Sequence, residues 1–298
     1  MIGTTARVGN PSLIIAPVRE SREFVSCSLI IGTAEQLKEI CLFADGKADY
    51  IFIDAEGKTP DAACFVTLAR SIVLRSTVRT YKGNDITALA CDLLISSIIP
   101  DVSSLKAAVL GAGNLGSKAA LALAERGARV SICRRDDKAT LLAEALNSML
   151  SKHSQGRIIA ASSLAEAADG AHIVIGFTQG LPVITAEMMG SLPAGALIID
   201  GGIGTLYEEA VQEANQRGHF VYRLDVRIAF AHIVNSILST EQFLAHTAGR
   251  VCRDGSFYVA GGVIGMKGDI VVDSLQALHS VIGVADGKGG VDRSRHPY

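Results

Sequence analysis

The stretch VLGAGNLG, residues 109–116, constrains the fold more than any other part of the chain. Its three glycines form a GxGxxG pattern between an apolar strand candidate, AAVL, and a helix candidate, NLGSKAALALAERG. In such a unit the first glycine allows a tight turn, the second lets the backbone approach a pyrophosphate, and the third allows close packing of helix and strand. The pattern therefore predicts a dinucleotide site in a parallel α/β sheet, and a purely structural turn is the alternative.

The end of the second strand of this unit indicates which coenzyme is bound. NAD-dependent enzymes usually carry Asp or Glu there, and its carboxylate binds the ribose 2′-hydroxyl. This chain has Arg134 and Arg135 instead, and a guanidinium can bind a 2′-phosphate through charge-assisted hydrogen bonds. We interpret Asp136 and Asp137 as caps of the next helix. NADP is therefore expected and NAD is less favoured, with a solvated charged turn as the alternative.

Further coenzyme contacts are expected at the carboxyl ends of the parallel strands, where open α/β sheets bind ligands. The predicted fourth strand ends at Thr178 and Gln179, and the fifth ends at Asp200, closely followed by Ile203. Asp200 has a structural alternative, because its side chain can bond the backbone of the glycine turn that follows it. The complete predicted set is Gly111, Gly113, Asn114, Leu115, Gly116, Arg134, Arg135, Thr178, Gln179, Asp200 and Ile203.

Alternating strand and helix patterns predict an α/β protein with two sheets. From Lys106 onwards the alternation is regular, as in parallel βαβ units, and a shorter alternation precedes it. We expect an N-terminal α/β substrate and catalytic domain at 1–99 and an NADP-binding Rossmann domain at 100–255. Residues 256–298 are expected to form a strand, a glycine turn and a long helix that packs back onto the N-terminal domain.

Charge and hydropathy exclude several classes of partner. Lys and Arg number 28 against 30 Asp and Glu, so no basic excess indicates nucleic acid. No apolar run is long enough to cross a bilayer, and the N-terminus lacks the apolar core of a signal peptide. We expect a cytoplasmic protein with a small-molecule substrate, no membrane contact, and homo-oligomers formed through the apolar stretch 230–244.

No metal site is expected. The six cysteines contain no CxxC pair and lie in apolar surroundings, and the histidines lack the spacing of metal ligands. Buried free thiols are favoured over a metal site or a disulfide framework, which agrees with a reducing compartment.

Several motifs occur in an order that resembles the methylene-tetrahydrofolate and methylene-tetrahydromethanopterin dehydrogenases, over roughly residues 48–283. CRRDDKA (133–139) resembles the NADP-binding strand end of the bacterial enzyme that oxidises both methylene pterins, and GNDITALACDLL (83–94) resembles the start of its linking helix. The other motifs are LPAGALIIDGGIG (192–204), LDV (224–226) and the glycine turn AGGVIGMKGD (260–269). The resemblance implies hydride transfer between NADP and a methylene-tetrahydropterin.

The departures from these families concern the catalytic lysine. The chain has no Tyr-x-x-x-Lys motif of the folate enzymes in its first domain. Shikimate dehydrogenases have a related plan, and their Asn-Arg-Thr-x-x-Lys-Ala stretch is matched in part by residues 133–139, but their lysine in an Asn-Val-Thr loop is absent too. A methylene pterin needs little acid–base catalysis, because a nitrogen lone pair stabilises the cation left by hydride loss and positioning supplies much of the rate.

Candidate catalytic and substrate-binding residues lie on loops around the expected cleft. Lys58 follows a buried strand, Asp85 lies at the start of the linking helix, and Lys267 lies in the C-terminal glycine turn. Helix capping alone could explain Asp85 and its neighbours, and both lysines could be solvated. The predicted catalytic residues are Lys58, Asp85 and Lys267, and the predicted substrate-binding residues are Asn84, Thr87 and Gly262.

The leading hypothesis is therefore an NADP-dependent oxidoreductase that acts on a methylene-tetrahydropterin. The alternative enzyme is a shikimate-like or amino/imino-acid dehydrogenase, which needs a proton acceptor near the nicotinamide. Lys58, Lys82 and Asp85 are the candidates for that role. A third hypothesis is a sensor that binds NADP without turning it over.

Overall fold

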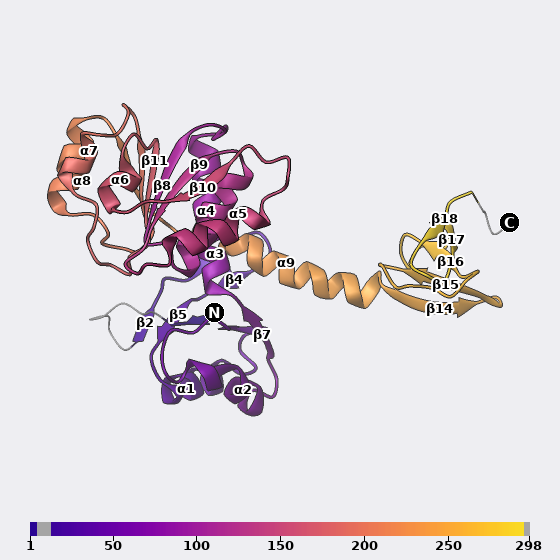
Figure 1. Ribbon diagram of the computed structural model, residues 1–298. Helices are drawn as coiled ribbons and strands as arrows, with labels where there is room; N and C mark the ends of the chain where they lie inside the picture. The colour runs from indigo at the N-terminus through magenta and orange to yellow at the C-terminus, as the bar shows by residue number, and fades with distance from the viewer. Residues whose placement is uncertain (5–12, 295–298) are drawn as a thin grey trace. The chain divides into compact units, whose positions relative to one another are not determined.

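The computed structural model describes residues 1–4 and 13–294. The chain divides into two compact units, Met1–Ala231 and His232–Tyr298, which are described separately. The first unit contains two α/β sheets, each with its own helices, and the second contains a small sheet of short strands (Figure 1). The expected fold class, a Rossmann-type parallel sheet with a smaller N-terminal α/β domain, is confirmed.

The N-terminal sheet has the strand order β2-β5-β1-β6-β7, in which β2 alone is antiparallel to its neighbour. Its strands are β1 (Ile2–Gly3), β2 (Leu13–Ile15), β5 (Leu29–Ile31), β6 (Tyr50–Asp54) and β7 (Thr77–Tyr81). A separate hairpin is formed by β3 (Arg19–Glu20) and β4 (Val25–Ser26). Because β1, β5, β6 and β7 are parallel, their carboxyl ends form one edge, where ligands bind in sheets of this kind.

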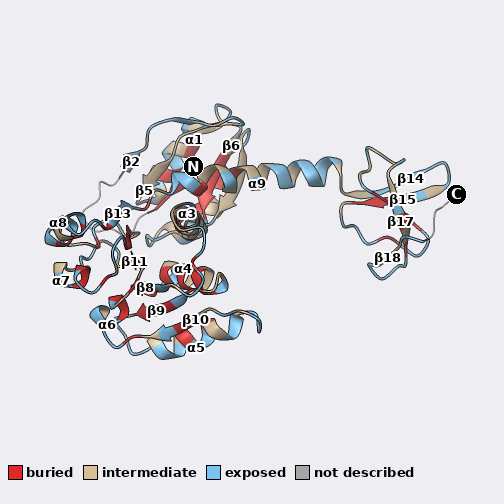
Figure 2. Ribbon diagram, turned by 90° about the horizontal axis from the view of Figure 1, so that it is seen from above, coloured by how far each residue is buried: buried red, intermediate tan, exposed pale blue. Residues whose placement is uncertain are grey.

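Two amphipathic helices, α1 (Ala34–Ala44) and α2 (Ala62–Ile72), bury their apolar residues against this sheet. Leu37 of α1 and Phe65 of α2 lie in one core with Ile53 of β6. Figure 2 shows β6 largely in the colour of buried residues. Helix α1 begins with a capping box in which Thr33 and Gln36 satisfy each other's backbone N–H groups. The periodicity of residues 33–46 and 61–74 therefore predicted both helices correctly.

Helix α3 (Gly83–Ile98) leads from the first sheet to the second, and its N-terminus is capped by another element. Asp54, at the end of β6, accepts a hydrogen bond from the backbone N–H of Gly83 at 2.9 Å, and Glu56 accepts one from Asn84 at 2.9 Å. These two carboxylates satisfy N–H groups that have no acceptor within the helix. Capping therefore does not explain the polar residues in the first turn of α3.

The second sheet is entirely parallel, with the order β10-β9-β8-β11-β12-β13. Its strands are β8 (Lys106–Leu110), β9 (Arg129–Cys133), β10 (Arg157–Ala160), β11 (Ile173–Gly176), β12 (Leu197–Asp200) and β13 (Phe220–Arg223). Its helices are α4 (Asn114–Glu125), α5 (Ala139–Met149), α6 (Leu164–Ala168), α7 (Ala186–Met189) and α8 (Glu208–Gln216). The strand order reverses between β8 and β11, and this switch point is where such sheets bind nucleotides.

The two faces of this sheet are covered by different helices. Alternate residues of β8, Ala108 and Leu110, lie in a core with residues of α6, α7 and α8, whereas Val109 faces Gly116 of α4. Figure 1 shows α4 and α5 on the side opposite α6, α7 and α8. Because both faces are buried, the strands consist of nearly continuous apolar residues.

The second unit is largely a sheet of five short strands in the order β14-β15-β16-β17-β18. They are β14 (Gly249–Arg253), β15 (Ser256–Ala260), β16 (Ile270–Val272), β17 (Val281–Ala285) and β18 (Val291–Asp292). Helix α9 (Arg227–His246) spans the boundary between the units and carries the apolar stretch 230–244. Formation of homo-oligomers through that stretch stays a prediction.

The prediction of a long helix after the C-terminal glycine turn is wrong. Ile270 and Val272 are buried on alternate positions of a strand, and turns at 274–280 lead into a second strand. The β-branched residues of DIVV and SVIGV favour extended backbone, and this preference outweighed the apolar spacing that had indicated a helix. In the part of the chain that the structure describes, no helix is both long and apolar enough to span a bilayer.

Candidate coenzyme and substrate site

The glycine loop between β8 and α4 has the geometry that the three glycines predict. Gly111 has a φ of +97°, and a Cβ there would lie 2.5 Å from the carbonyl oxygen of Phe177. A Cβ on Gly116 would lie 2.5 Å from the carbonyl oxygen of Gly111, so this glycine permits the close packing of α4. A Cβ on Gly113 would meet no atom within 4 Å, so the backbone there faces open space.

The start of α4 can bind an anion. Gly113 precedes the helix without a side-chain cap, so the N–H groups of Asn114, Leu115 and Gly116 have no acceptor within the helix. These groups and the positive end of the helix dipole suit a phosphate. The open approach at Gly113 and the uncapped helix start fit the pyrophosphate of a dinucleotide.

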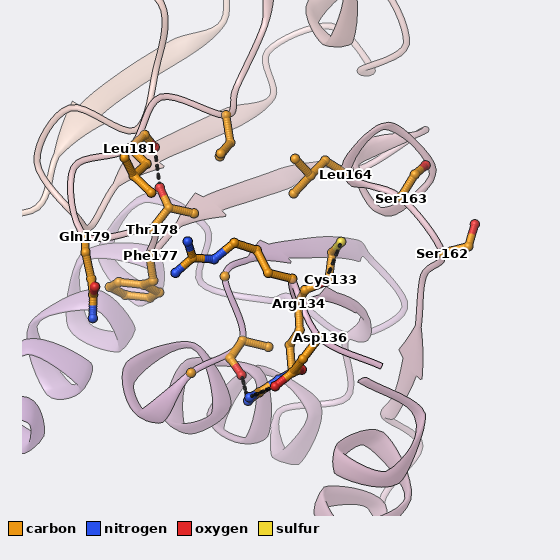
Figure 3. Close-up of a pocket in the computed structure, with 15 residues that line it drawn as sticks. Cys133, Arg134, Asp136, Ser162, Ser163, Leu164, Phe177, Thr178, Gln179 and Leu181 are labelled. Atoms are coloured by element: carbon orange, nitrogen blue, oxygen red, sulfur yellow. Dashed lines mark hydrogen bonds and ion pairs between the residues drawn. The ribbon is translucent and has the colours of Figure 1, made fainter. Parts of the chain in front are cut away.

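A cavity of about 620 Å³ lies beside this loop. Figure 3 shows Cys133, Arg134 and Asp136 on one side of it and Phe177, Thr178 and Gln179 on another. The volume lies in the range of small-molecule and cofactor sites, about 300–1,000 Å³. Six predicted coenzyme residues line it: Gly111, Gly113, Arg134, Arg135, Thr178 and Gln179.

The two arginines after β9 have different surroundings. Arg134 donates to both carboxylate oxygens of Asp136, at 2.7 and 2.9 Å, and to the carbonyl oxygen of Ala112 in the glycine loop at 2.5 Å. The Arg134 hydrogen bond holds the pKa of Asp136 down at about 2. Arg135 is exposed, lines the cavity, and makes no hydrogen bond or ion pair with the residues that the structure describes.

The interpretation of Asp136 and Asp137 as helix caps is wrong. Helix α5 begins after Lys138 and has no side-chain cap. The carboxylate of Asp136 is bound instead by two nitrogens of the Arg134 guanidinium in a bidentate ion pair. Arg134 therefore holds the glycine loop, and of these two arginines Arg135 alone has no hydrogen bond or ion pair with the described residues.

The loops after β11 and β12 carry the other predicted coenzyme residues. Gln179 and Ile203 have φ values of 56° and 58°, a left-handed backbone that non-glycine residues seldom adopt. Asp200 accepts hydrogen bonds from the backbone N–H of Gly204 at 2.6 Å and from the buried hydroxyl of Thr205 at 2.9 Å. Its carboxylate thus holds its own loop, the structural alternative stated for it, and a role in coenzyme binding stays a prediction.

A second polar cluster joins the N-terminal domain to α4. Lys118 of α4 donates to Asp85 of α3 in a short hydrogen bond, and its Nζ lies 3.6 Å from Glu56. Lys82 lies 3.5 Å from the other oxygen of Asp85. The Lys118 hydrogen bond lowers the pKa of Asp85, despite the opposing effect of partial burial. Burial acts to lower the pKa of Lys118, but Asp85 and Glu56 together raise it.

The other predicted catalytic and substrate residues are more scattered. The side chain of Thr87 donates to the carbonyl oxygen of Gly83 within α3 at 3.0 Å, whereas Asn84 is buried beside Glu56. Lys58 is exposed, and its backbone N–H donates to the buried Thr4 at 2.6 Å. Lys267 and Gly262 are exposed on a turn of the second unit. Their roles stay predictions.

Several residues of the site were not predicted. Lys118 and Glu56 were missed because ion pairs between domains leave no local sequence pattern. The cavity is also lined by Ser162 and Ser163 before α6, where Ser163 accepts from the N–H of Glu166 at 3.1 Å and Glu166 accepts from that of Ser162 at 2.7 Å. The sequence SSLAE after a strand carries this capping-box signal. The signal could have predicted that the loop between β10 and α6 lies at the cavity.

Comparison with known proteins supports the nucleotide-binding assignment. Residues 93–225 match the family model described as Shikimate / quinate 5-dehydrogenase. The matched segment runs from within α3 to just beyond β13 and so contains the whole parallel sheet. No curated protein matches the chain.

Several solved structures are similar to part of the chain at low identity. L-tryptophan dehydrogenase from Nostoc punctiforme is 17% identical with a TM-score of 0.47, covering 72% of this chain and 63% of its own. The solved chain of dipicolinate synthase from Bacillus halodurans is 17% identical with a TM-score of 0.39, covering 64% and 66%. Shikimate dehydrogenase from Aquifex aeolicus is 20% identical with a TM-score of 0.36, covering 50% and 52%.

The chain spans less than two thirds of the length of each of these three proteins. The family match favours the shikimate-like alternative, and none of the comparisons supports a relation to the methylene-tetrahydropterin dehydrogenases in particular. Residues 93–225 thus resemble the NAD(P)-binding dehydrogenase domain of shikimate and quinate dehydrogenases.

Proposed function

We propose that this protein is an NADP-dependent dehydrogenase that transfers a hydride between nicotinamide and a small hydroxy, amino or imino acid. The observation that carries the proposal is the exposed Arg135 beside the open glycine loop. A bound nicotinamide coenzyme supplies the hydride donor or acceptor, and the residues of this chain bind and orient it.

The charges at the end of β9 support NADP over NAD. An acidic residue that binds the ribose 2′-hydroxyl would have to be free to accept hydrogen bonds. Asp136, whose carboxylate lies at the cavity, already accepts two hydrogen bonds from Arg134. Arg135 carries a positive charge without a protein partner among the described residues, and a 2′-phosphate can pair with it.

The family match and the second polar cluster support the proposed substrate class. A methylene pterin needs no proton transfer at the reacting carbon, whereas a hydroxy or amino acid loses a proton as well as a hydride. The groups that could exchange this proton, Asp85 and Lys118, lie together where α3 and α4 begin. We therefore favour the shikimate-like or amino/imino-acid dehydrogenase over the methylene-tetrahydropterin enzyme.

Coenzyme titrations test the proposal. Wild type, Arg135→Ala and Arg134→Ala are titrated with NADPH and NADH while nicotinamide fluorescence is followed. Lys138→Ala is the charge-matched control, because Lys138 is an exposed cation on the same loop that does not line the cavity. A charge-assisted hydrogen bond contributes about 1.5–3 kcal/mol, so Arg135→Ala is expected to raise the Kd for NADPH about tenfold to a hundredfold.

The pattern across variants distinguishes the two arginines. Arg135→Ala should leave the Kd for NADH within about twofold, and Lys138→Ala should leave both constants nearly unchanged. Arg134→Ala should weaken both coenzymes, because it removes the contact with the glycine loop. Tighter binding of NADH by wild type, or an Arg135→Ala variant that binds NADPH normally, would contradict the assignment of NADP.

A further inference from the structure

A cluster formed by Lys118, Asp85 and Glu56 lies apart from the residues that line the coenzyme cavity. Its members come from three elements: the first turns of α4, the first turn of α3 and the loop after β6. The side chains of Lys118 and Asp85 are 34% and 40% exposed, so the cluster is open to small molecules and water. It lies at the carboxyl edge of the N-terminal sheet, because Glu56 follows β6 and Asp85 follows β7.

Helix capping accounts for Glu56 in this cluster, but not for Asp85 or Lys118. Asp54 and Glu56 bond the first N–H groups of α3, and Asp85 is not used as a cap. The carboxylate of Asp85 is directed instead to Lys118, with Lys82 near its other oxygen. The chain thus positions one ammonium group between two carboxylates.

Holding α3 against α4 does not account for it either. The same two helices are joined by a second ion pair, in which Arg126 donates to Asp92 at 3.0 Å. Asp92 lies seven residues after Asp85 on α3, about 10 Å further along the axis. An exposed ion pair contributes at most about 1 kcal/mol to the free energy of unfolding. Neither pair is therefore expected to have a large effect on the stability of the fold.

Lys118 is also close to the coenzyme site. It lies four residues after Asn114, which is the first residue of α4, so about 6 Å separates them along the axis. The uncapped start of this helix is where the phosphates are expected. A lysine one turn further on, reaching the carboxyl edge of the other sheet, can meet a substrate that lies between the two sheets.

We propose that Lys118 is the proton-transfer residue of this dehydrogenase, positioned by Asp85 and Glu56, and that it selects substrates whose oxidation releases a proton from oxygen or nitrogen. This inference rests on the proposed dehydrogenase function. It places the lysine on the nucleotide-binding domain, whereas the residues first considered for this role, Lys58, Lys82 and Asp85, all belong to the N-terminal domain.

The chemistry balances most simply in the direction of reduction. The carbonyl or imine carbon receives a hydride from the reduced coenzyme and its π bond breaks, while the oxygen or nitrogen takes a proton from Lys118. One N–H bond of the ammonium breaks, one O–H or N–H bond forms, and the neutral amine regains a proton from water. An ammonium group is protonated at neutral pH at its ordinary pKa, and Asp85 and Glu56 hold that of Lys118 in place.

The experiment compares Lys118→Met with Arg126→Met, which removes the second ion pair and leaves the cluster intact. NADPH oxidation is followed with pyruvate, 2-oxoglutarate and 3-dehydroshikimate, each with and without ammonium chloride. NADP reduction is followed with 5,10-methylene-tetrahydrofolate. The Kd for NADPH and the Tm of every variant are measured in parallel.

General acid–base catalysis contributes about 10²- to 10⁴-fold. If the proposal holds, wild type reduces an oxo acid or an imine and Lys118→Met lowers kcat at least a hundredfold. Its Kd for NADPH and its Tm should stay close to those of Arg126→Met, which keeps near-normal kcat. Lys118→Arg should also be slow, since a guanidinium does not release its proton at these pH values.

The other outcomes overturn the proposal in distinguishable ways. If oxo acids are reduced and Lys118→Met retains kcat within about threefold, Lys118 is not the proton donor and the dehydrogenase function stands. If methylene-tetrahydrofolate is the compound turned over, the inferred substrate class is wrong. If NADPH binds and none of the compounds is turned over, both this inference and the proposed function fail.

Discussion

Replacing Gly113 with Ala is a direct test of the coenzyme site, because the change should affect a ligand and not the protein. Gly113 has φ −84° and ψ −153°, which any residue can adopt. A Cβ there meets no atom within 4 Å. The methyl group therefore fits the folded chain, and the space that it fills is where the backbone must approach a pyrophosphate.

The expected magnitudes differ sharply between folding and binding. Alanine is a poorer residue than glycine before a helix by roughly 0.5 kcal/mol, and the reduced freedom of the unfolded chain offsets this by about 0.4–1 kcal/mol. The free energy of unfolding should therefore change by less than about 1 kcal/mol, and the Tm by less than about 4 °C. Loss of one phosphate hydrogen bond costs about 1.5–3 kcal/mol, which raises the Kd about tenfold to a hundredfold.

The assay is fluorescence titration with NADPH and with NADH, together with thermal unfolding. Gly190→Ala is the matched control, since Gly190 has a φ of −67° at the end of α7 and does not line the cavity. The change at Gly113 should weaken both coenzymes equally, because both carry the pyrophosphate. Binding of NADPH with the affinity of wild type would refute the placement of the pyrophosphate against this loop.

Three further predictions concern the stability of the fold. Gly111→Ala should lower the free energy of unfolding, measured by urea titration, by about 2–4 kcal/mol, because the residue has a φ of +97° and faces the carbonyl oxygen of Phe177. Unchanged stability would show that the loop relaxes freely. Thr205→Val removes a fully buried hydroxyl that donates to Asp200, and should cost about 1–3 kcal/mol; differential scanning calorimetry would show the Tm fall, whereas no fall would mean that Asp200 does not hold its loop. In the second unit, hydrogen bonds from Arg250 lower the pKa of the buried Asp269 below its ordinary value of 3.8. A carboxylate whose pKa is lowered in the folded state stabilises the fold above pH 3.8, and this stabilisation is lost as the pH falls through the folded pKa. The protection factors of the amides in β14–β17 should therefore fall below about pH 4 in wild type, whereas in Asp269→Asn they should show no such fall.

The sequence predicted the nucleotide-binding sheet well because the signals for it are local. Strand, glycine turn and helix follow one another within residues 106–127, and each glycine has the steric role that the motif assigns to it. The buried strands of a parallel sheet are apolar runs of four or five residues, and such runs are visible without knowledge of tertiary contacts.

The rest depended on contacts between residues distant in sequence. Asp54 and Glu56 accept hydrogen bonds from helix N–H groups that lie 29 and 28 residues later, and Lys118 reaches Asp85 from 33 residues away. The two arginines after β9 look equivalent in sequence, but among the described residues only Arg134 has a carboxylate and a carbonyl partner. The C-terminal strands were misjudged because an apolar segment with β-branched residues fits a helix or a strand until its neighbours are known.

The separation between Arg134 and Arg135 has a consequence for how such a protein can change over generations. Arg134 is tied to the glycine loop and to Asp136, so its replacement alters the architecture of the site. Arg135 touches no described part of the chain through a hydrogen bond or an ion pair, so a mutation there leaves the fold intact. If Arg135 binds the 2′-phosphate as proposed, coenzyme preference can drift by single substitutions at this exposed position, without the loss of stability that usually limits the evolution of binding sites.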